Sequence, residues 1–450
     1  MPLVACGSNG SGQLAIGHDE DVSSFTPCVF DPSCPTWAVS EDCEIVDLVS
    51  AASHALLLIR LRSQDPAATP RNVLLGAGTN THGQLGLRCA LTDSPTVATS
   101  FRPFSLARDA GLDDTWEPVK VAATWTTSFV VYERQGHHAT GPFPEQVVVA
   151  GGSNDFGEIG VAPSKPAVMR VDAALQDGEW VEHLHGGQRH VVAVVSHGHG
   201  DNRTQRVVGW GAARRGELSA VPLPPPTRGT KGKGKAVATP TTLPPTPINL
   251  AIPSGTHVID LALGAAHSIA LCANGTVLAW GSDAKGQITG LTSSSSSLSS
   301  PSSLPSMITH VRCIGATWGG SYLLTGDAIW SQGGNTHGQL LRHTPADANS
   351  GASRADDHDN NAAARGPVLL PDHDAVTSAL VAGSEHVLVV ADGGKTLYTG
   401  GWNEHGNLGV GDTVDRGRLV PAGVGQGLDS GARTIVRVWG GCAASWVWTR

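Results

Sequence analysis

One short phrase recurs seven times along the chain and constrains its fold more than any other feature. Each copy starts with a glycine and has a second glycine five positions later, followed by Gln, Glu or Asn and then by an aliphatic residue. The copies are GSNGSGQ (7–13), GTNTHGQ (78–84), GSNDFGE (152–158), GAARRGE (211–217), GSDAKGQ (281–287), GGNTHGQ (333–339) and GWNEHGN (401–407). Such a repeat over 450 residues is typical of an array of similar structural units rather than of unrelated domains.

The second glycine of each phrase is predicted to form a tight turn between strands, because glycine adopts positive φ without steric cost. The Asn or Asp at the third position favours the same turn, since its side chain can bond to the backbone nearby. The structural glycines are Gly12, Gly83, Gly157, Gly216, Gly286, Gly338 and Gly406.

A second repeated element reads as strand, small-residue turn, strand. Its copies are residues 46–59, 119–132, 182–195, 259–272, 311–325, 378–391 and 435–449. The first glycine phrase has no such element before it, and the last element has no phrase after it. If Leu3 to Cys6 pairs with the C-terminal strands, one unit is built from both ends and no sheet edge is left open. We therefore predict an all-β fold in which residues 1–450 form a single seven-bladed β-propeller.

Three low-complexity stretches fall outside this pattern. Residues 221–247 are rich in proline with a short lysine run, residues 292–306 are rich in serine, and residues 344–366 are polar. They carry too little apolar surface to offset the entropy of ordering, so they are predicted to be disordered loop insertions.

Composition and charge argue against several classes of protein. A net charge of −9 does not suit a broad nucleic-acid footprint, and we expect no direct nucleic-acid binding. The chain shows neither a secretory leader nor a long apolar run, so no membrane association is expected. Its eight cysteines form no C-x-x-C pair, which favours reduced thiols in the cytoplasm, with the nucleus as a further location. Motifs for nucleophilic or phosphate chemistry are missing, so neither enzymatic activity nor a cofactor is expected.

Candidate binding residues are sought where the sevenfold pattern breaks. The turn of the second element ends in His at four copies but in Thr127, Gly320 and Ala444 at the other three. Two residues before those replacements stand Trp125, Trp318 and Cys442. Equivalent positions of a propeller share one face, so these side chains are candidate partner-binding anchors, with packing between blades as the alternative.

The four repeated histidines, His54, His190, His267 and His386, have a different predicted role. In a propeller they stand in separate blades and cannot share one metal ion, so we expect structural hydrogen bonds and no metal site.

Two weaker candidate groups lie at the ends of the repeat array. Trp402, Glu404 and His405 sit in the seventh phrase, with an exposed turn tip as the alternative reading. Asp19, Glu20 and Asp21 follow the first phrase, where carboxylates can attract a basic partner or simply be solvated.

These phrases resemble the regulator of chromosome condensation repeat family of β-propellers. A narrower resemblance, to the fungal alpha-tubulin suppressor (killer-toxin-insensitivity) branch, is carried by GSNGSGQLAIGHDED (7–21), GSEH (383–386), GWNEHGN (401–407) and VWGGCAASWVW (438–448). That branch implies a non-enzymatic propeller, a monomer or 1:1 heterodimer, that partners a small CSL-type zinc or iron protein. It also implies roles in diphthamide biosynthesis on elongation factor 2 and in Elongator-dependent modification of the tRNA wobble uridine.

Two alternatives come from other members of the repeat family. One is a guanine-nucleotide exchange factor for a Ran-like small GTPase, against which we set the acidic composition and the missing basic N-terminal tail. The other is a ubiquitin-ligase-associated interaction module, which normally accompanies a second catalytic domain. Both remain open from the sequence, because fold alone does not determine function.

Overall fold

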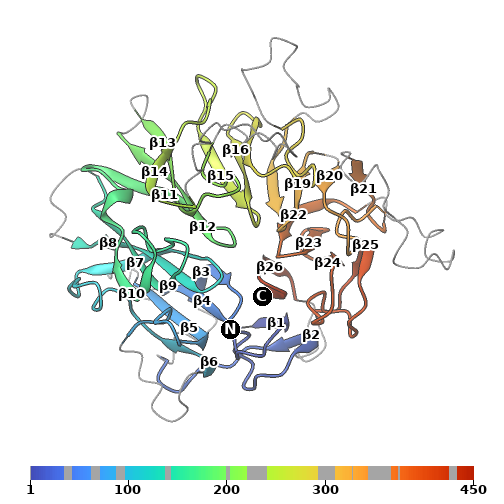
Figure 1. Ribbon diagram of the computed structural model, residues 1–450. Coiled ribbons are helices and arrows are strands. Elements are labelled where there is room, and N and C mark those ends of the chain that lie inside the picture. Colours follow the sequence, from blue (N-terminus) through green and yellow to red (C-terminus); the bar gives the residue numbers. More distant parts are fainter. Residues whose placement is uncertain are drawn as a thin grey trace, which may run out of the picture.

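The computed structural model describes residues 2–34, 43–61, 71–87, 97–136, 143–198, 203–219, 241–291, 310–326, 328–342, 366–372, 375–424 and 433–450. Within these ranges the chain forms seven antiparallel sheets arranged as a ring, together with one short 3-10 helix, η3 (Asp172–Ala174) (Figure 1). The predicted all-β, seven-bladed propeller is therefore confirmed. We number the blades 1 to 7 in chain order, starting with the sheet β3 to β6 and ending with the sheet built from both chain ends.

Every blade contributes its first strand to the wall of the central channel. These inner strands are β3 (Cys43–Ser50), β7 (Trp116–Ala123), β11 (Glu179–Gly186), β15 (Val258–Leu263), β18 (Cys313–Ala316), β22 (Thr377–Ala382) and β26 (Ile435–Gly440). The second strands are β4 (His54–Leu61), β8 (Thr127–Arg134), β12 (His190–His197), β16 (His267–Cys272), β19 (Gly320–Leu324), β23 (His386–Ala391) and β27 (Ala444–Thr449).

Farther from the channel come the third strands, β5 (Asn72–Thr79), β9 (Gln146–Asn154), β13 (Thr204–Ala212), β17 (Val277–Gly281), β20 (Ile329–Gly333), β24 (Thr396–Gly401) and β1 (Leu3–Gly7). The outer strands are β6 (Val97–Pro103), β10 (Ser164–Arg170), β14 (Thr242–Ile248), β21 (Gly366–Val368), β25 (Arg416–Pro421) and β2 (Val22–Pro27). Blade 4 has three strands in the described part of the chain.

The ring closes in blade 7, whose strand order is β2-β1-β27-β26. Strand β1 pairs with β27 from Leu3 opposite Trp448 to Gly7 opposite Ala444. The amide of Thr449 also donates to the carbonyl of Pro2, at 3.1 Å, and the two chain ends lie side by side (Figure 1). The predicted closure by both chain ends is therefore present.

The core is divided among the interfaces between neighbouring blades. Second strands are buried on both faces, so their alternating side chains serve two interfaces. In β4, Leu56 and Leu58 pack toward blade 2, whereas Leu57 and Ile59 pack toward blade 7. Each of the seven blade interfaces has its own apolar cluster in this way.

Two boundaries of the predicted insertions are wrong. Residues 242–247 belong to β14, which pairs with β13 from Thr242 opposite Ala212 to Ile248 opposite Val207. Its sequence, TLPPTPI, looks unsuited to a strand, but β14 is the outer edge of blade 3, where proline costs no ladder hydrogen bond. Gly366, placed in the third insertion, likewise begins β21. The other predicted insertion residues, apart from 241, lie outside the described ranges.

Candidate functional site

The glycine phrases and the turns of the second repeated element lie on one face of the propeller, which we call the motif face. It consists of the seven glycine phrases and the seven inner loops, which join each inner strand to its second strand. In every blade a phrase amide donates to the third residue of the inner loop, as in Thr79 to the carbonyl of Ser53 and Trp402 to that of Glu385. The corresponding bonds are Ser153 to Thr126, Ala212 to Arg189, Ser282 to Ala266, Gly334 to Gly319 and Ser8 to Ala443.

Within each phrase, side chains hold the turn. The amide of Leu14 donates to Oδ1 of Asn9, at 2.9 Å, and the amide of Ser11 donates to Oε1 of Gln13, at 2.9 Å. The second glycine lies between these residues with positive φ, 69° at Gly12, and the other six copies are alike. A side chain would strain this conformation, so the repeated glycine has a local cause. The phrase is therefore a rigid platform that presents its fourth and fifth residues to solvent.

Trp125 and Trp318 lie in the inner loops of blades 2 and 5, on the motif face. Their rings stack with centroids 5.3 Å apart and an interplanar angle of 19°. Both side chains line the central channel, and Trp125 remains 37% exposed. The two rings thus contact each other across the mouth of the channel.

Cys442 occupies the equivalent position in blade 7, and it also lines the channel. Its amide donates to the carbonyl of Ser50 in blade 1, at 3.2 Å. Burial raises the pKa of its thiol to about 11, which keeps the sulfur protonated and poorly nucleophilic at neutral pH. This residue supports the rim of the channel and has no sign of reactive-thiol chemistry.

The weaker candidates from the two ends of the repeat array come together in space. Nδ1 of His405 in blade 6 lies 2.6 Å from Oδ2 of Asp21 in blade 7. The other carboxylate oxygen of Asp21 accepts the amide of Asn9, at 2.7 Å. The indole of Trp402 lies edge-on to His405, with ring centroids 5.3 Å apart. Residues of the two separately predicted groups thus form one cluster.

The same arrangement is repeated one blade earlier. Nδ1 of His337 in blade 5 lies 3.1 Å from Oδ2 of Asp415 in blade 6, whose Oδ1 accepts the amide of Asn403, at 2.9 Å. Exposed carboxylates surround these pairs on blades 6 and 7. We call this region the acidic pole of the motif face and define it by Asp19, Glu20, Asp21, Glu404 and Asp415.

Blades 3 and 4 present the opposite charge, which the sequence reading did not single out. The side chains of Arg189, Arg214, Arg215 and Lys285 are exposed there, and we call them the basic pole. The guanidinium of Arg189 covers the ring of Phe156, 4.0 Å from its centroid. Within the described ranges none of the four forms an ion pair, so their charge is available to a partner. The signal was the change from Asn-type to Arg-rich and Lys-bearing phrases, GAARRGE and GSDAKGQ.

Each of the four repeated histidines contacts a serine of the next blade. Nε2 of His54 lies 2.9 Å from Oγ of Ser128, and Nε2 of His386 lies 2.9 Å from Oγ of Ser445. The other pairs are His190 with Ser268 at 3.3 Å and His267 with Ser321 at 3.1 Å. Ser445 also donates to the carbonyl of Asn407, at 2.6 Å.

A Ser–His pair has the composition of a hydrolytic dyad, but here all eight side chains are at most 1% exposed. Burial lowers the pKa of His54 and His190 to about 3 and that of His267 and His386 to about 4. No substrate reaches these neutral imidazoles, so the pairs join blades.

Burial also perturbs two carboxyls of the glycine phrases. Glu158 and Glu217 stand where most copies have Gln, and they are 3% and 4% exposed. Burial raises the pKa of Glu158 to about 7 and raises that of Glu217, against the opposing effect of backbone hydrogen bonds. Oε2 of Glu158 accepts the amide of Phe156, at 2.7 Å, in the place of the usual Gln oxygen.

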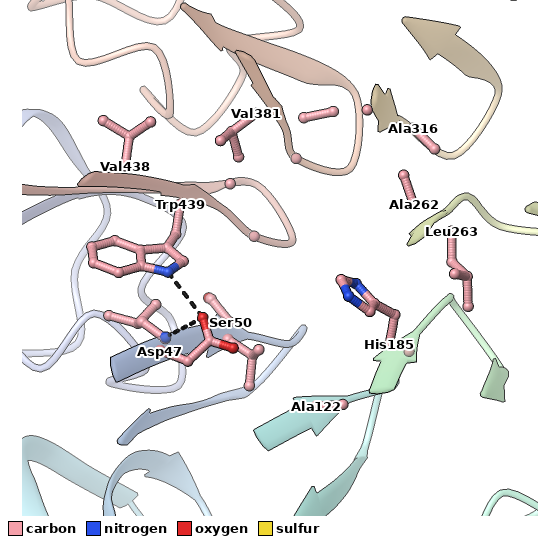
Figure 2. Close-up of a pocket in the computed structure, with 18 of the residues that line it drawn as sticks. Asp47, Ser50, Ala122, His185, Ala262, Leu263, Ala316, Val381, Val438 and Trp439 are labelled. Carbon is pink, nitrogen blue, oxygen red and sulfur yellow. Dashed lines mark hydrogen bonds between the residues drawn. The ribbon is translucent and has the colours of Figure 1, made fainter. Parts of the chain in front are cut away.

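The central channel encloses a cavity of about 870 Å³ (Figure 2). Midway along the inner strands, the seven equivalent positions hold Asp47, Lys120, His183, Asp260, Cys313, Ala379 and Arg437. On one side Arg437 donates to Asp47, at 3.2 Å, and the indole Nε1 of Trp439 donates to the same carboxylate oxygen, at 3.2 Å (Figure 2).

The described residues contain no group of three or more His, Cys, Asp or Glu side chains that could hold a metal ion. No helix in the described part of the chain is long and apolar enough to cross a membrane.

Both the repeat and the fold of this chain are similar to those of known proteins. Residues 258–287 match the model of the regulator of chromosome condensation (RCC1) repeat. The secretion-regulating guanine nucleotide exchange factor of Bos taurus is 25% identical over 426 residues, which cover 92% of this chain and 76% of that protein. The crystal structure of human WBSCR16 has a TM-score of 0.66 at 17% identity and covers 100% of both chains.

A third similar structure is Prp20p of Saccharomyces cerevisiae, which has a TM-score of 0.66 at 19% identity. The match covers 100% of this chain and 91% of Prp20p, whose structure was described together with its binding to Gsp1p and histones. The chain thus carries an RCC1 repeat and has the RCC1-like propeller fold. The narrower likeness to the alpha-tubulin suppressor branch is not shown by these matches.

These relatives overturn the functional expectations drawn from that narrower likeness. The non-enzymatic role in diphthamide biosynthesis and Elongator-dependent tRNA modification is wrong, because the similar bovine protein is named an exchange factor, a class that catalyses nucleotide release. The CSL-type metalloprotein partner is wrong for the same reason, since the yeast propeller is described with Gsp1p and histones. The resemblance in a few turn phrases predicted the fold correctly but not the partner.

Proposed function

We propose that this propeller binds a small GTPase of the Ran-like class through its motif face and accelerates the release of guanine nucleotide. The observation that carries the proposal is the similarity, over 92% of the chain, to a protein named as a guanine nucleotide exchange factor. We also propose a cytoplasmic or nuclear location, where such GTPases act.

The motif face has features that suit a protein partner. Trp125 and Trp402 offer partly exposed aromatic surface, and aromatic side chains dominate the energy of many interfaces. The acidic pole on blades 6 and 7 and the basic pole on blades 3 and 4 are separated around the ring, so a partner with complementary charges is held in one orientation. Complementary surface charge of this kind speeds association more than it adds affinity.

Exchange requires that the propeller bind the nucleotide-free GTPase more tightly than the nucleotide-loaded form, because only a difference in affinity shifts an equilibrium. The propeller's part in this reaction is recognition by a preformed surface. Its glycine phrases are hydrogen-bonded to the inner loops in all seven blades, so the motif face is already ordered and docking costs little conformational entropy.

The test is release of a fluorescent GDP analogue from purified GTPases of the Ran, Rab, Rho, Arf and Ras classes, each mixed with the full-length propeller. We expect at least a tenfold acceleration for one class. The double variant Trp125→Ala/Trp318→Ala should reduce that acceleration at least tenfold. Val376→Ala is the matched control, since Val376 is 71% exposed next to the opposite end of an inner strand and should leave the rate unchanged. No acceleration with any class would reject the proposal.

A further inference from the structure

The central channel has one side whose polar groups satisfy one another and one side whose polar groups do not. On the side of blades 7 and 1, Asp47 accepts hydrogen bonds from Arg437 and Trp439. On the side of blades 2 to 4, Lys120, His183 and His185 have no hydrogen-bond or ion-pair partner among the described residues. Asp260 accepts a hydrogen bond from the amide of Leu261, at 2.8 Å, and none from a side chain in those ranges.

These four side chains are half-buried in the wall of the cavity. Polar and charged groups withdrawn from water cost free energy unless they are paired. Burial lowers the pKa of Lys120, against the opposing effect of the Asp47 and Glu133 carboxylates. Burial also lowers the pKa of His183 to about 4 and raises that of Asp260, so burial disfavours the charged form of each group. Groups in this condition inside a concave site are typical of ligand-binding positions.

The spacing of the two charges indicates what fits. Lys120, His183 and Asp260 stand at equivalent positions of blades 2, 3 and 4, so His183 lies between the ammonium and the carboxylate. His183 interacts electrostatically with both of them. His185 lies one pleat closer to the motif face and points into the cavity (Figure 2). The wall continues on blades 5 and 6 with small apolar side chains, among them Ala316 and Val381 (Figure 2).

From this arrangement we propose that the channel is a binding site for a small zwitterion that carries one carboxylate or phosphate and one ammonium group on a short apolar spacer. The anionic group of the ligand pairs with Lys120, and its ammonium group pairs with Asp260. His183 and His185 hydrogen-bond to it as neutral imidazoles, and the spacer packs against blades 5 and 6. A cavity of about 870 Å³ is within the range of ordinary small-molecule sites, roughly 300–1,000 Å³. The site lies beneath the Trp125–Trp318 stack and is separate from the GTPase surface.

The experiment is a calorimetric titration of the full-length protein with ω-amino acids of increasing length, from glycine to 6-aminohexanoate, and with O-phosphoethanolamine. Butyrate and butylamine serve as probes with one charge each. We expect an optimum length among the ω-amino acids, with the single-charge probes at least tenfold weaker. Comparison of O-phosphoethanolamine with the ω-amino acid of similar length distinguishes a phosphate from a carboxylate as the preferred anion.

Three variants of the channel wall and one control variant locate the binding. Lys120→Met and Asp260→Asn should each weaken the best probe at least tenfold. Lys165→Met is the matched control, because Lys165 is exposed on the outer strand of the same blade as Lys120. If removing a charge disturbs folding, Ala316→Leu narrows the channel from its apolar wall and should weaken binding without changing any charge. No heat from any probe at millimolar concentration, or equal binding by wild type and Lys120→Met, would overturn the proposal.

Discussion

Four blade interfaces contain a His–Ser hydrogen bond and three do not, and the two groups differ at the mouth of the channel. The four blades that supply His carry Ala52, Gln188, Ala265 or Ser384 at the middle of the inner loop. The three that lack it carry Trp125, Trp318 and Cys442. The same sheet geometry therefore serves two purposes: His-bearing blades join their neighbours, and the others place large or polarizable side chains on the channel rim.

The partner serine explains which interfaces have the bond. Where a blade lacks His, the next blade has Val191, Val387 or Ala55 in place of serine. These residues belong to apolar clusters, so at this position the three interfaces have apolar packing in place of the His–Ser hydrogen bond. A buried His without its serine would have an unpaired polar atom, which costs about 1–3 kcal/mol. The two positions therefore change together.

The largest effect that separates the two groups is expected on acidification. An unfolded His has a pKa near 6.5, whereas the four buried imidazoles have pKa values of about 3 to 4. Between those values the unfolded chain binds protons that the folded chain does not, so stability falls as the pH falls. At pH 5 each imidazole lowers the free energy of unfolding by about 2 kcal/mol, or about 8 kcal/mol for four.

That sum is comparable to the whole stability of an ordinary domain. Circular dichroism followed from pH 7 to pH 3 should show cooperative unfolding near pH 5. The variant His386→Gln should flatten the dependence by less than a quarter, since it removes one of the four interface imidazoles and the lowered pKa of His183 also contributes. A protein that stays folded to pH 3 would contradict the assignment of these groups.

The next largest effect comes from deleting one link at neutral pH. His386→Ala removes a fully buried side chain and leaves Ser445 without its imidazole partner, which should lower the free energy of unfolding by about 3 kcal/mol. Thr127→Ala, at the equivalent position of a blade without His, removes one hydrogen bond to the carbonyl of Ser153 and should cost about 1 kcal/mol. Urea denaturation of both variants measures the difference, and equal losses would remove the distinction between the two groups of blades.

Blade 2 differs from most other blades a second time, at Glu158, as blade 3 does at Glu217. Its folded pKa of about 7 is above the ordinary value of 4.5, so the folded chain binds the extra proton and stability falls as pH rises through that window. Glu158→Gln should therefore raise the free energy of unfolding by about 2 kcal/mol at pH 8 and by little at pH 4.5. The reverse change, Gln84→Glu in blade 1, should create the same pH dependence. Thermal unfolding at the two pH values distinguishes these outcomes from a pH-independent change.

The smallest expected effect comes from introducing a His–Ser hydrogen bond at a blade interface that lacks one. In three His-bearing blades a glycine lies under the ring: a Cβ at Gly187, Gly264 or Gly383 would lie 2.1–2.4 Å from the imidazole Cε1. Blade 2 has Thr124 there, so the variant to build is Thr124→Gly/Thr127→His/Val191→Ser.

In a double-mutant cycle on the Thr124→Gly background, the substitutions Thr127→His and Val191→Ser should show a favourable coupling energy of about 1 kcal/mol. A coupling energy near zero would mean that the bond depends on blade geometry that blade 2 lacks.

Much of this architecture could be predicted from the sequence. The spacing of the repeats, the glycine phrases and the unmatched elements at the two ends predict a closed seven-bladed ring. Each of these features follows from local chemistry that is repeated along the chain. The His–Ser links could also have been predicted, because each depends on one residue of the following blade, the residue directly after the position equivalent to His. In each blade that follows a His-bearing blade this residue is a serine: Ser128, Ser268, Ser321 or Ser445.

Other features depend on geometry that no local pattern reports. Trp125 and Trp318 are 193 residues apart and meet only because blades 2 and 5 face each other across the channel mouth. The contact between His405 and Asp21 joins positions 384 residues apart through ring closure. Strand β14 was missed because its prolines argue against a strand everywhere except at a sheet edge.

The closure of blade 7 has a consequence for the order of folding during synthesis. Strand β1 is synthesised before every other described strand, yet its neighbour β27 is synthesised after all of them. Since the chain is synthesised from its N-terminus, β1 must remain without that partner while six blades form. Blade 7, with the Asp21–His405 contact and the Ser445 link, then assembles in a single late step. A ribosome stalled before residue 444 should hold an open, protease-sensitive ring.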